Sequence, residues 1–377
     1  MGRPSPGTIA ALHEAIDRLT QTEATGTERT LELFEAVERA RKQVSQLVHA
    51  DPSSILLVEN TSRGLGLVAS SLPLERGDNI LVDDLEFLSA TVVWRTLCQR
   101  RGVEIRPVPT RGGEVHPEHF AARRSRALVL SSVQEVSGYR ASLHGLAELS
   151  RQLGAYLIVD GIQEVGAVPV DLGSCLADAY CAGGHKWLRS PLGLGFLYVS
   201  PQLLERLTPP SFGFLALEEP EGGWELYLQS PTRTPFDSLP TLSDVRRLNS
   251  GGMPNALGAI ALYHAAEESC RVGPEAVWQK ICSLRTRLIE GLRPLGVRLF
   301  PFDAEGGSDH VSGIVCFGLP EGLVAERALW RKCIEARVYL SLRYISGIGG
   351  IRASIHYDNT AEDVNRLLAV SREFLRA

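Results

Sequence analysis

The sequence lacks long apolar runs, an excess of basic residues and paired cysteines. No apolar run approaches the ~20 residues that a membrane-spanning helix needs, and the chain does not open with a basic segment followed by an apolar one, as a signal peptide does. With 39 basic and 44 acidic side chains, the formal net charge is −5, which leaves no basic footprint for nucleic acid. These absences predict a cytoplasmic protein with no membrane and no nucleic-acid partner.

The seven cysteines are dispersed, odd in number and without a Cys-x-x-Cys pair. This pattern argues against a disulfide framework and against a zinc cluster. We therefore expect no metal site and buried free thiols at Cys98, Cys175, Cys181, Cys270, Cys282, Cys316 and Cys333.

The 377 residues are 44% hydrophobic and 22% charged, which is typical of a globular protein of about two domains. Short apolar runs alternate with helical stretches in the first part of the chain, at 55–58, 80–84, 103–108 and 127–130. This alternation predicts an α/β fold with a mostly parallel sheet, helices on both faces and a site at the carboxyl ends of the strands.

The chain is expected to divide into a large domain over residues 14–253 and a smaller α+β domain over residues 254–377. In the smaller domain, strands are expected at 297–302, 310–317, 338–342 and 350–356, with helices at 323–335 and 360–376. Thr8 and Thr360 are expected to cap helices, residues 29–49 form an amphipathic helix, and residues 1–13 are expected to pack at the active site.

The most informative stretch is 156–199, which reads as three buried strands. The first run ends in Asp160 and the second leads to Lys186, so a carboxylate and an amine can face one ligand between them. Pyridoxal phosphate requires such a pair, an acid for its ring nitrogen and a lysine for its aldehyde. Either residue alone is more often a turn residue or a solvated surface residue; with Gln163 and His185 beside them, the pair indicates a cofactor site.

This stretch resembles the cofactor segment of the class V aminotransferases, whose pattern is Asp-Gly-x-Gln followed by His-Lys-Trp. The resemblance implies a fold-type I pyridoxal phosphate enzyme with a seven-stranded sheet in its large domain, and a homodimer with sites at the subunit boundary. It also implies that Lys186 forms the Schiff base, that Asp160 pairs with the ring nitrogen, that Gln163 donates to the ring hydroxyl and that His185 lies at the cofactor.

A turn from a strand into a helix at 59–66 can cradle a phosphate with its backbone amides and the hydroxyls of Thr61 and Ser62. Caps are the alternative role for these hydroxyls, and the resemblance favours the phosphate. Related enzymes carry Ser or Thr at Gly183 and a Thr from the partner subunit at Gly252, so phosphate binding here is expected to depend on backbone amides. Phe87 matches the ring that stacks on the cofactor, the alternative being a core phenylalanine.

Arg352 lies in an Arg-x-Ser-x-His string that matches the carboxylate-binding arginine of the family. Its planar guanidinium suits a substrate's α-carboxylate, whereas an isolated arginine is more often part of a structural salt bridge. Arg343 is expected to touch the distal part of the substrate. Gln134, in a loop that passes beside the cofactor in relatives, is also expected to contact the substrate. The next residue, Glu135, is expected to be a solvated loop acid.

These motifs serve transamination, epimerisation and β-elimination alike. Cysteine desulfurases carry a nucleophilic cysteine on the loop before the carboxylate arginine, and residues 340–352 contain none. The N-terminal turn resembles the ergothioneine-type lyases, so we favour β-elimination from an S-substituted cysteine in specialised biosynthesis. An aminotransferase or an epimerase is the alternative. A non-catalytic member of the fold would be expected to lack Lys186 or Arg352, and both are present.

Overall fold

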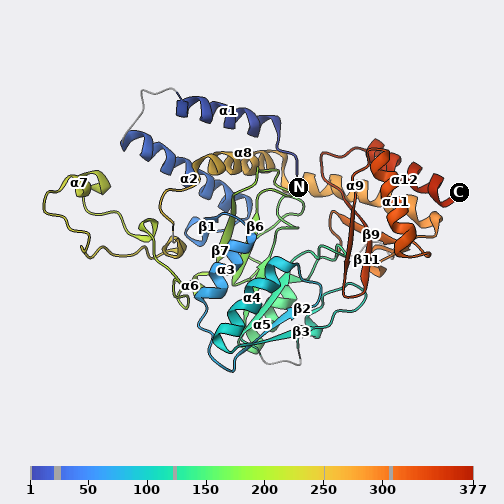
Figure 1. Ribbon diagram of the computed structural model, residues 1–377, viewed down its shortest axis with the longest axis horizontal. Helices are drawn as coiled ribbons and strands as arrows, with labels where there is room; N and C mark the ends of the chain where they lie inside the picture. The colour runs from blue at the N-terminus through green and yellow to red at the C-terminus, as the bar shows by residue number, and fades with distance from the viewer. Residues whose placement is uncertain (1, 21–26, 122–124, 250, 305–308, 377) are drawn as a thin grey trace.

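The computed structural model describes residues 2–20, 27–121, 125–249, 251–304 and 309–376. Figure 1 shows a large unit built on a seven-stranded sheet, beside a smaller unit that carries the C-terminus. Within these described residues, no helix is both long enough and apolar enough to cross a membrane.

The large sheet has the strand order β1-β7-β6-β5-β4-β2-β3. Its strands are parallel from β3 to β6, whereas β7 runs antiparallel to both β1 and β6. The predicted mostly parallel seven-stranded sheet of an α/β fold is therefore confirmed. The strands are β1 (Ile55–Val58), β2 (Asn79–Asp83), β3 (Glu104–Val108), β4 (Ala127–Ser131), β5 (Tyr156–Asp160), β6 (Ala179–Gly183) and β7 (Gly195–Val199).

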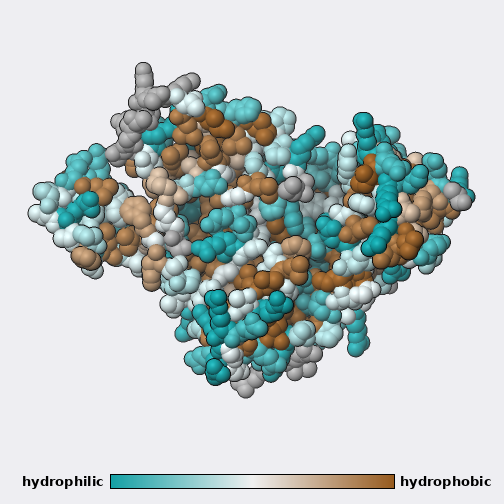
Figure 2. Space-filling model, viewed as in Figure 1, coloured by the Kyte–Doolittle hydropathy of each residue, from teal (hydrophilic) through white to brown (hydrophobic). Residues whose placement is uncertain are grey.

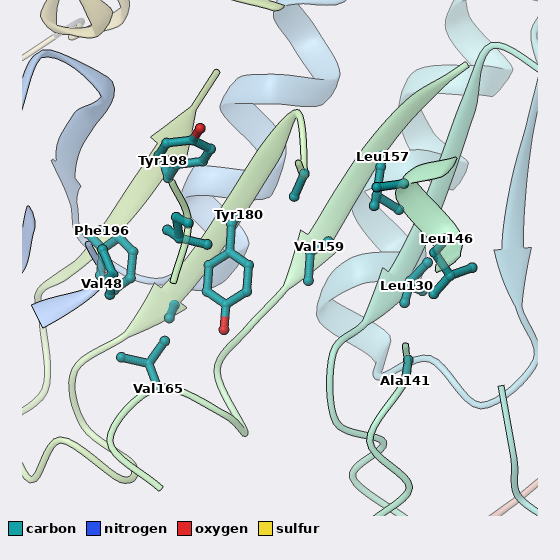
Figure 3. Packing of buried hydrophobic residues seen from close by; sticks show 14 of the residues in the cluster. Val48, Leu130, Ala141, Leu146, Leu157, Val159, Val165, Tyr180, Phe196 and Tyr198 are labelled. Atoms are coloured by element: carbon teal, nitrogen blue, oxygen red, sulfur yellow. The ribbon is translucent and has the colours of Figure 1, made fainter. Parts of the chain in front are cut away.

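Alternate side chains of the central strands enter two separate apolar clusters. Leu157 and Val159 face one cluster (Figure 3) and Ile158 faces the other, and all three are fully buried. Burial on both faces explains why these strands are continuous apolar runs. Each such side chain stabilises the fold by ~1.5–3 kcal/mol, so the strand ends that carry the site rest on a well-packed base.

Two sets of helices cover the sheet. One face packs against α3 (Thr61–Ser71) and α4 (Leu88–Arg101), which contribute side chains such as Leu65 and Trp94. The other face packs against α2, α5 and α8, which contribute Val44, Leu146 and Leu262. The remaining bounds are α1 (Pro6–Thr20), α2 (Thr27–Leu47), α5 (Leu143–Leu153), α6 (Pro201–Leu204), α7 (Gly223–Gln229) and α8 (Ala256–Val272).

The start of α1 corrects one expectation. The Thr8 amide donates to Ser5 Oγ at 3.1 Å, and the helix begins at Pro6. Ser5 therefore caps the helix, because Thr8 already lies within its first turn.

Helix α8 packs on α2 and joins the core beneath the large sheet, although the expected division at residue 254 assigns it to the small domain. The chain then turns at Gly273 into α9 (Pro274–Leu292), whose Leu288 and Ile289 belong to the core of the small unit.

The small unit is an antiparallel sheet in the order β10-β11-β9-β8, packed against α9, α11 and α12. Thr360 Oγ1 accepts from the Asp363 amide at 3.3 Å, which confirms the predicted cap of the last helix. The elements are β8 (Arg298–Leu299), α10 (Pro301–Ala304), β9 (Ile314–Gly318), α11 (Leu323–Glu335), β10 (Ser341–Ile345), β11 (Ile348–Ser354) and α12 (Ala361–Arg376).

Three of the strands predicted in this unit are wrong in extent, and the one expected over 310–317 begins only at Ile314, as β9. The strand expected over 297–302 is reduced to β8, because Pro301 opens α10 and proline favours the first turn of a helix. The strand expected at 338–342 begins three residues later, as β10. Ser346 and Gly347 have φ of 48° and 80°, so they form the tight turn that sets the register of the β10–β11 hairpin.

Gly138 provides a test of how the two units dock. It has a φ of +83°, and a Cβ there would lie 2.4 Å from the Ile314 carbonyl oxygen of β9; Gly154 has a φ of +63° and no atom within 4 Å. We expect Gly154→Ala to cost about 1 kcal/mol through its left-handed backbone, and Gly138→Ala to cost clearly more because β9 must move. Urea unfolding of both variants measures the difference, and equal losses would contradict the docking role of Gly138.

Candidate active site

The parallel strands of the large sheet place polar residues at a common edge. β4 ends at Ser131 and β5 at Asp160, and these two residues lie opposite each other. Asp160 also lies opposite Cys181, shortly before β6 ends and the chain turns into Lys186. Because ligands bind outside the carboxyl ends of such strands, this edge is the candidate active site.

Asp160 and Lys186 influence each other's ionisation at this edge. Burial raises the pKa of Asp160 to about 6, opposed by a 3.0 Å hydrogen bond from the Ile162 amide and by the charge of Lys186. Burial lowers the pKa of Lys186, and the carboxylates of Asp160 and Glu135 oppose that shift. The site therefore offers an amine that releases its proton more readily than usual and a carboxylate that gains from a cation beside it.

Gln163 is buried and held by the tryptophan that follows the lysine. Its Oε1 accepts from Trp187 Nε1 at 3.1 Å. The indole ring in turn stacks on His356, with ring centroids 5.8 Å apart, and His356 Nε2 lies 3.0 Å from the Trp187 carbonyl oxygen. With Oε1 engaged, Gln163 Nε2 is the atom left to donate to a ligand. His185 is half-buried, and burial lowers the pKa of its imidazole.

The N-terminus of α3 meets β6 at close range. A Cβ at Gly64 would lie 2.2 Å from Cys181 Sγ, so only glycine allows this approach. Asn60 caps the helix by accepting from the Arg63 amide at 2.9 Å, so the cap is not Thr61 or Ser62. Thr61 is buried, and its Oγ1 has no hydrogen-bond partner within the described part of the chain. The free hydroxyl and the first helical amides suit an anion.

Gln134 is held by two buried acids that the sequence did not single out. Its Nε2 donates to Asp83 Oδ2 at 3.2 Å and lies 3.5 Å from Glu86 Oε1. Burial raises the pKa of Asp83 to about 7 and that of Glu86 well above its usual range, so the pair retains a proton near neutrality. This contact turns Gln134 so that its buried Oε1 remains as an acceptor without a partner among the described residues.

Glu135 is not the solvated loop acid expected from the sequence. Arg352 Nη1 donates to its carbonyl oxygen at 2.9 Å and to its Oε2 at 3.1 Å, and Arg343 Nε lies 3.8 Å from the same Oε2. The Glu135 side chain is 20% exposed. Arg352 lies 217 positions away in the sequence, so no local pattern could have indicated this contact.

Two other predicted residues are exposed in the single chain. Phe87 is 44% exposed at the start of α4, where it precedes the first helical residue without capping the helix. Gly252 is exposed, with no atom within 4 Å of its Cβ position.

The N-terminal residues lie against the lysine turn. The Gly2 amide donates to the His185 carbonyl oxygen at 3.0 Å, and a Cβ at Gly2 would lie 2.1 Å from the Lys186 carbonyl oxygen. Arg189, which the sequence analysis missed, donates from Nε to the Arg3 carbonyl oxygen at 2.7 Å and pairs with Asp358 at 3.0 Å. Arg189 also has a φ of 62°, which is unusual for a residue with a side chain. Its contacts with Arg3 and Asp358 therefore stabilise a constrained backbone.

The residues present fit pyridoxal phosphate with an amino acid beside it. Three buried polar atoms, Thr61 Oγ1, Gln134 Oε1 and Arg352 Nε, lack hydrogen-bond partners among the described residues. A hydroxyl at a helix N-terminus suits a phosphate, a guanidinium suits a carboxylate, and the Lys186 and Asp160 pair suits an aldehyde and a ring nitrogen.

Comparisons with known proteins point in the same direction. The Aminotransferase class-V model matches residues 8–367. Isopenicillin N epimerase of Streptomyces clavuligerus is 30% identical over 341 residues, covering 87% of this chain and 82% of the relative. A probable cysteine desulfurase of Pyrococcus abyssi is 25% identical and covers 98% of this chain and 88% of the relative. The solved apo cysteine desulfurase of Thermococcus onnurineus NA1 shares the fold, with a TM-score of 0.81, 23% identity and coverage of 97% and 92%.

The coupling between Asp160 and Lys186 can be measured without any ligand. Because the Asp160 carboxylate raises the pKa of the Lys186 amine, Asp160→Asn should lower that pKa and make the amine more reactive at a given pH. Acylation of cofactor-free protein over a pH series, followed by mass spectrometry, reports the reactivity of Lys186. The exposed Lys280 and Lys332 are internal references, and an unchanged profile at Lys186 would show that the two charges do not interact.

Proposed function

The chain belongs to the class-V aminotransferase family, its cofactor is pyridoxal 5'-phosphate, and we propose that it catalyses β-elimination from an S-substituted cysteine. The products are a thiol or sulfenic acid, pyruvate and ammonia. Cysteine desulfurases among its relatives support a pyridoxal phosphate enzyme for cysteine-like substrates.

The observation that carries the proposal is the β10–β11 hairpin, which contains no cysteine next to Arg352. A desulfurase needs a thiolate there to attack the substrate's sulfur. Cys316 lies opposite Arg352 on β9, but it is fully buried, and burial raises the pKa of its thiol to about 12. Cys333 is also buried, with its pKa raised to about 11. The substrate's sulfur therefore leaves with its own substituent.

We assign the cofactor to the residues at the strand ends. Lys186 holds the aldehyde carbon, Asp160 the ring nitrogen, Gln163 Nε2 the ring hydroxyl, and the hydroxyls of Thr61 and Ser62 the phosphate. When bound, pyridoxal phosphate supplies an electron sink for the charge that develops at the substrate's Cα. Phe87 and His185 are proposed to flank the ring, and Gly252 is proposed to approach the phosphate from a second subunit.

Arg352 is proposed to bind the substrate's α-carboxylate, and Lys186 to remove the proton from Cα. Arg352 has a buried, unpartnered Nε with which to grip the α-carboxylate. With the substrate bound, the Lys186 amine would take the proton from Cα, and its lowered pKa makes the unprotonated amine easier to form. The Cα–H and Cβ–S bonds break, the sulfur leaves with the bonding electrons, and the remaining three-carbon fragment hydrolyses to pyruvate and ammonia.

Epimerisation is a second candidate, favoured by the 30% identity to isopenicillin N epimerase. It uses the same removal of the Cα proton and the same carboxylate grip. It differs only in returning a proton to the opposite face of Cα while the Cβ substituent stays attached.

Incubation with S-methyl-L-cysteine tests the choice. We expect stoichiometric pyruvate and methanethiol from the cofactor-loaded enzyme, and a loss on the order of a thousandfold in rate for Lys186→Ala, because the base is removed. Arg352→Lys is the matched variant: it keeps the charge but loses the planar fork, so KM should rise more than kcat falls. No pyruvate but loss of optical activity indicates the epimerase, and keto-acid-dependent transfer of the amino group indicates an aminotransferase.

We also propose a homodimer, supported by apolar side chains exposed on the single chain. Ile9, Ile16 and Leu19 are 39–46% exposed on α1, and Figure 2 shows apolar side chains gathered over this helix. Phe236, in the extended segment that carries α7, is 91% exposed. Sedimentation equilibrium should give twice the chain mass of 41.1 kDa, and a monomer at micromolar concentration would contradict the proposal.

A further inference from the structure

The loop between β4 and α5 carries Glu135 and is held by hydrogen bonds within the loop and to the small unit. Within the loop, the Gln134 amide donates to the Tyr139 carbonyl oxygen and the Ala141 amide to that of Ser132, both at 2.9 Å. Toward the small unit, Ser312 Oγ donates to the Gly138 carbonyl oxygen at 2.7 Å. The loop is therefore a defined structure, and the position of Glu135 is set by the contact between the two units.

The two arginines that meet Glu135 lie on one face of the small sheet. In the β10–β11 hairpin, Ser341 lies opposite Arg352, so Arg343, two residues after Ser341, points to the same face as Arg352. Their guanidinium groups repel each other, and each lowers the pKa of Lys186. One acid, Glu135, lies between these two cations, and its carboxylate reaches both.

The net charge at this face of the small sheet can be neutralised by one further carboxylate. Two guanidinium groups and one glutamate sum to a single positive charge, which an α-carboxylate on Arg352 would neutralise. A second acid group on the substrate would meet Glu135 instead of a free cation. Arg352 and Glu135 are only 12% and 20% exposed, so an unbalanced charge there is costly.

We propose that Glu135 is a specificity-determining residue, which occupies Arg343 and Arg352 so that the site accepts amino acids with one carboxylate and rejects those with an acidic side group. The inference rests on the proposed function, because it assumes that Arg352 receives the substrate's α-carboxylate. It narrows the substrate class to cysteine conjugates whose sulfur substituent carries no negative charge.

The test compares amino acids that differ only in one charge. The two pairs are aspartate with asparagine and glutamate with glutamine. None of these four amino acids carries a good leaving group on Cβ, so the cofactor's absorbance can report their dissociation constants without turnover. The wild-type protein should prefer the amides. In Glu135→Gln, the ratio of acid to amide affinity should rise about fivefold, the effect of a modest ion pair. An unchanged ratio overturns the proposal.

Two further variants control the interpretation. Glu104→Gln removes an acid paired with Arg106 on β3, away from this face, and should leave the ratio at its wild-type value. Arg343→Gln removes the second cation while Glu135 remains, so the ratio should shift in the opposite direction, toward the amides. If Glu135→Gln fails to fold, this arginine variant decides alone, and a ratio unchanged there overturns the proposal.

A measurement on cofactor-free protein separates this proposal from the proposed function. Malonate carries one carboxylate more than acetate, so it should raise the melting temperature of Glu135→Gln more than that of the wild-type protein, whereas acetate should affect both alike. This result would show that Glu135 keeps a second carboxylate from the two arginines even if no amino acid alters the cofactor's absorbance, an outcome that would overturn the proposed function. Equal responses to malonate in the two proteins overturn the selectivity of Glu135.

Discussion

The site depends on a buried carboxylate at the end of one parallel strand and a partly buried amine just beyond the end of the next. Asp160 and Lys186 each lose hydration, and each is partly compensated by the charge of the other. Such a pair costs stability when it is incomplete, so the surrounding structure must hold it. That cost is consistent with our proposal that this edge binds a ligand with a cationic ring nitrogen and an aldehyde that reacts with the amine.

The apolar core, close backbone contacts and the small unit together hold that pair in place. Side chains that alternate between two apolar clusters hold the strands, and glycines at 64 and 138 allow the backbone contacts that bring α3 and the β4–α5 loop to the site. The small unit contributes Arg352 and His356, which meet the large unit at Glu135 and Trp187. The residues that we propose for the substrate and for the cofactor thus come from different units, and the contact between the units sets their relative position.

Several features of this site are charges and dipoles held in place by the fold. A desulfurase route requires a reactive thiol, and the described cysteines near Arg352 are buried with raised pKa values. The balance of two arginines against Glu135 sets what the substrate's side group can carry. The acid pair of Asp83 and Glu86 turns Gln134 so that it presents an acceptor. Each of these features acts by fixing a charge or a dipole before the substrate arrives.

The sequence by itself determined the α/β fold and the approximate strand ends, because apolar periodicity and turn residues are local signals. It also placed Asp160 and Lys186 at adjacent strand ends, through a motif of short spacing. Only the tertiary structure decided the partners of Glu135, the orientation of Gln134 and the hydrogen bond from Arg189 to the Arg3 carbonyl oxygen. These contacts join residues up to 217 positions apart, and a single sequence carries no signal for a pairing that arises only when two units dock.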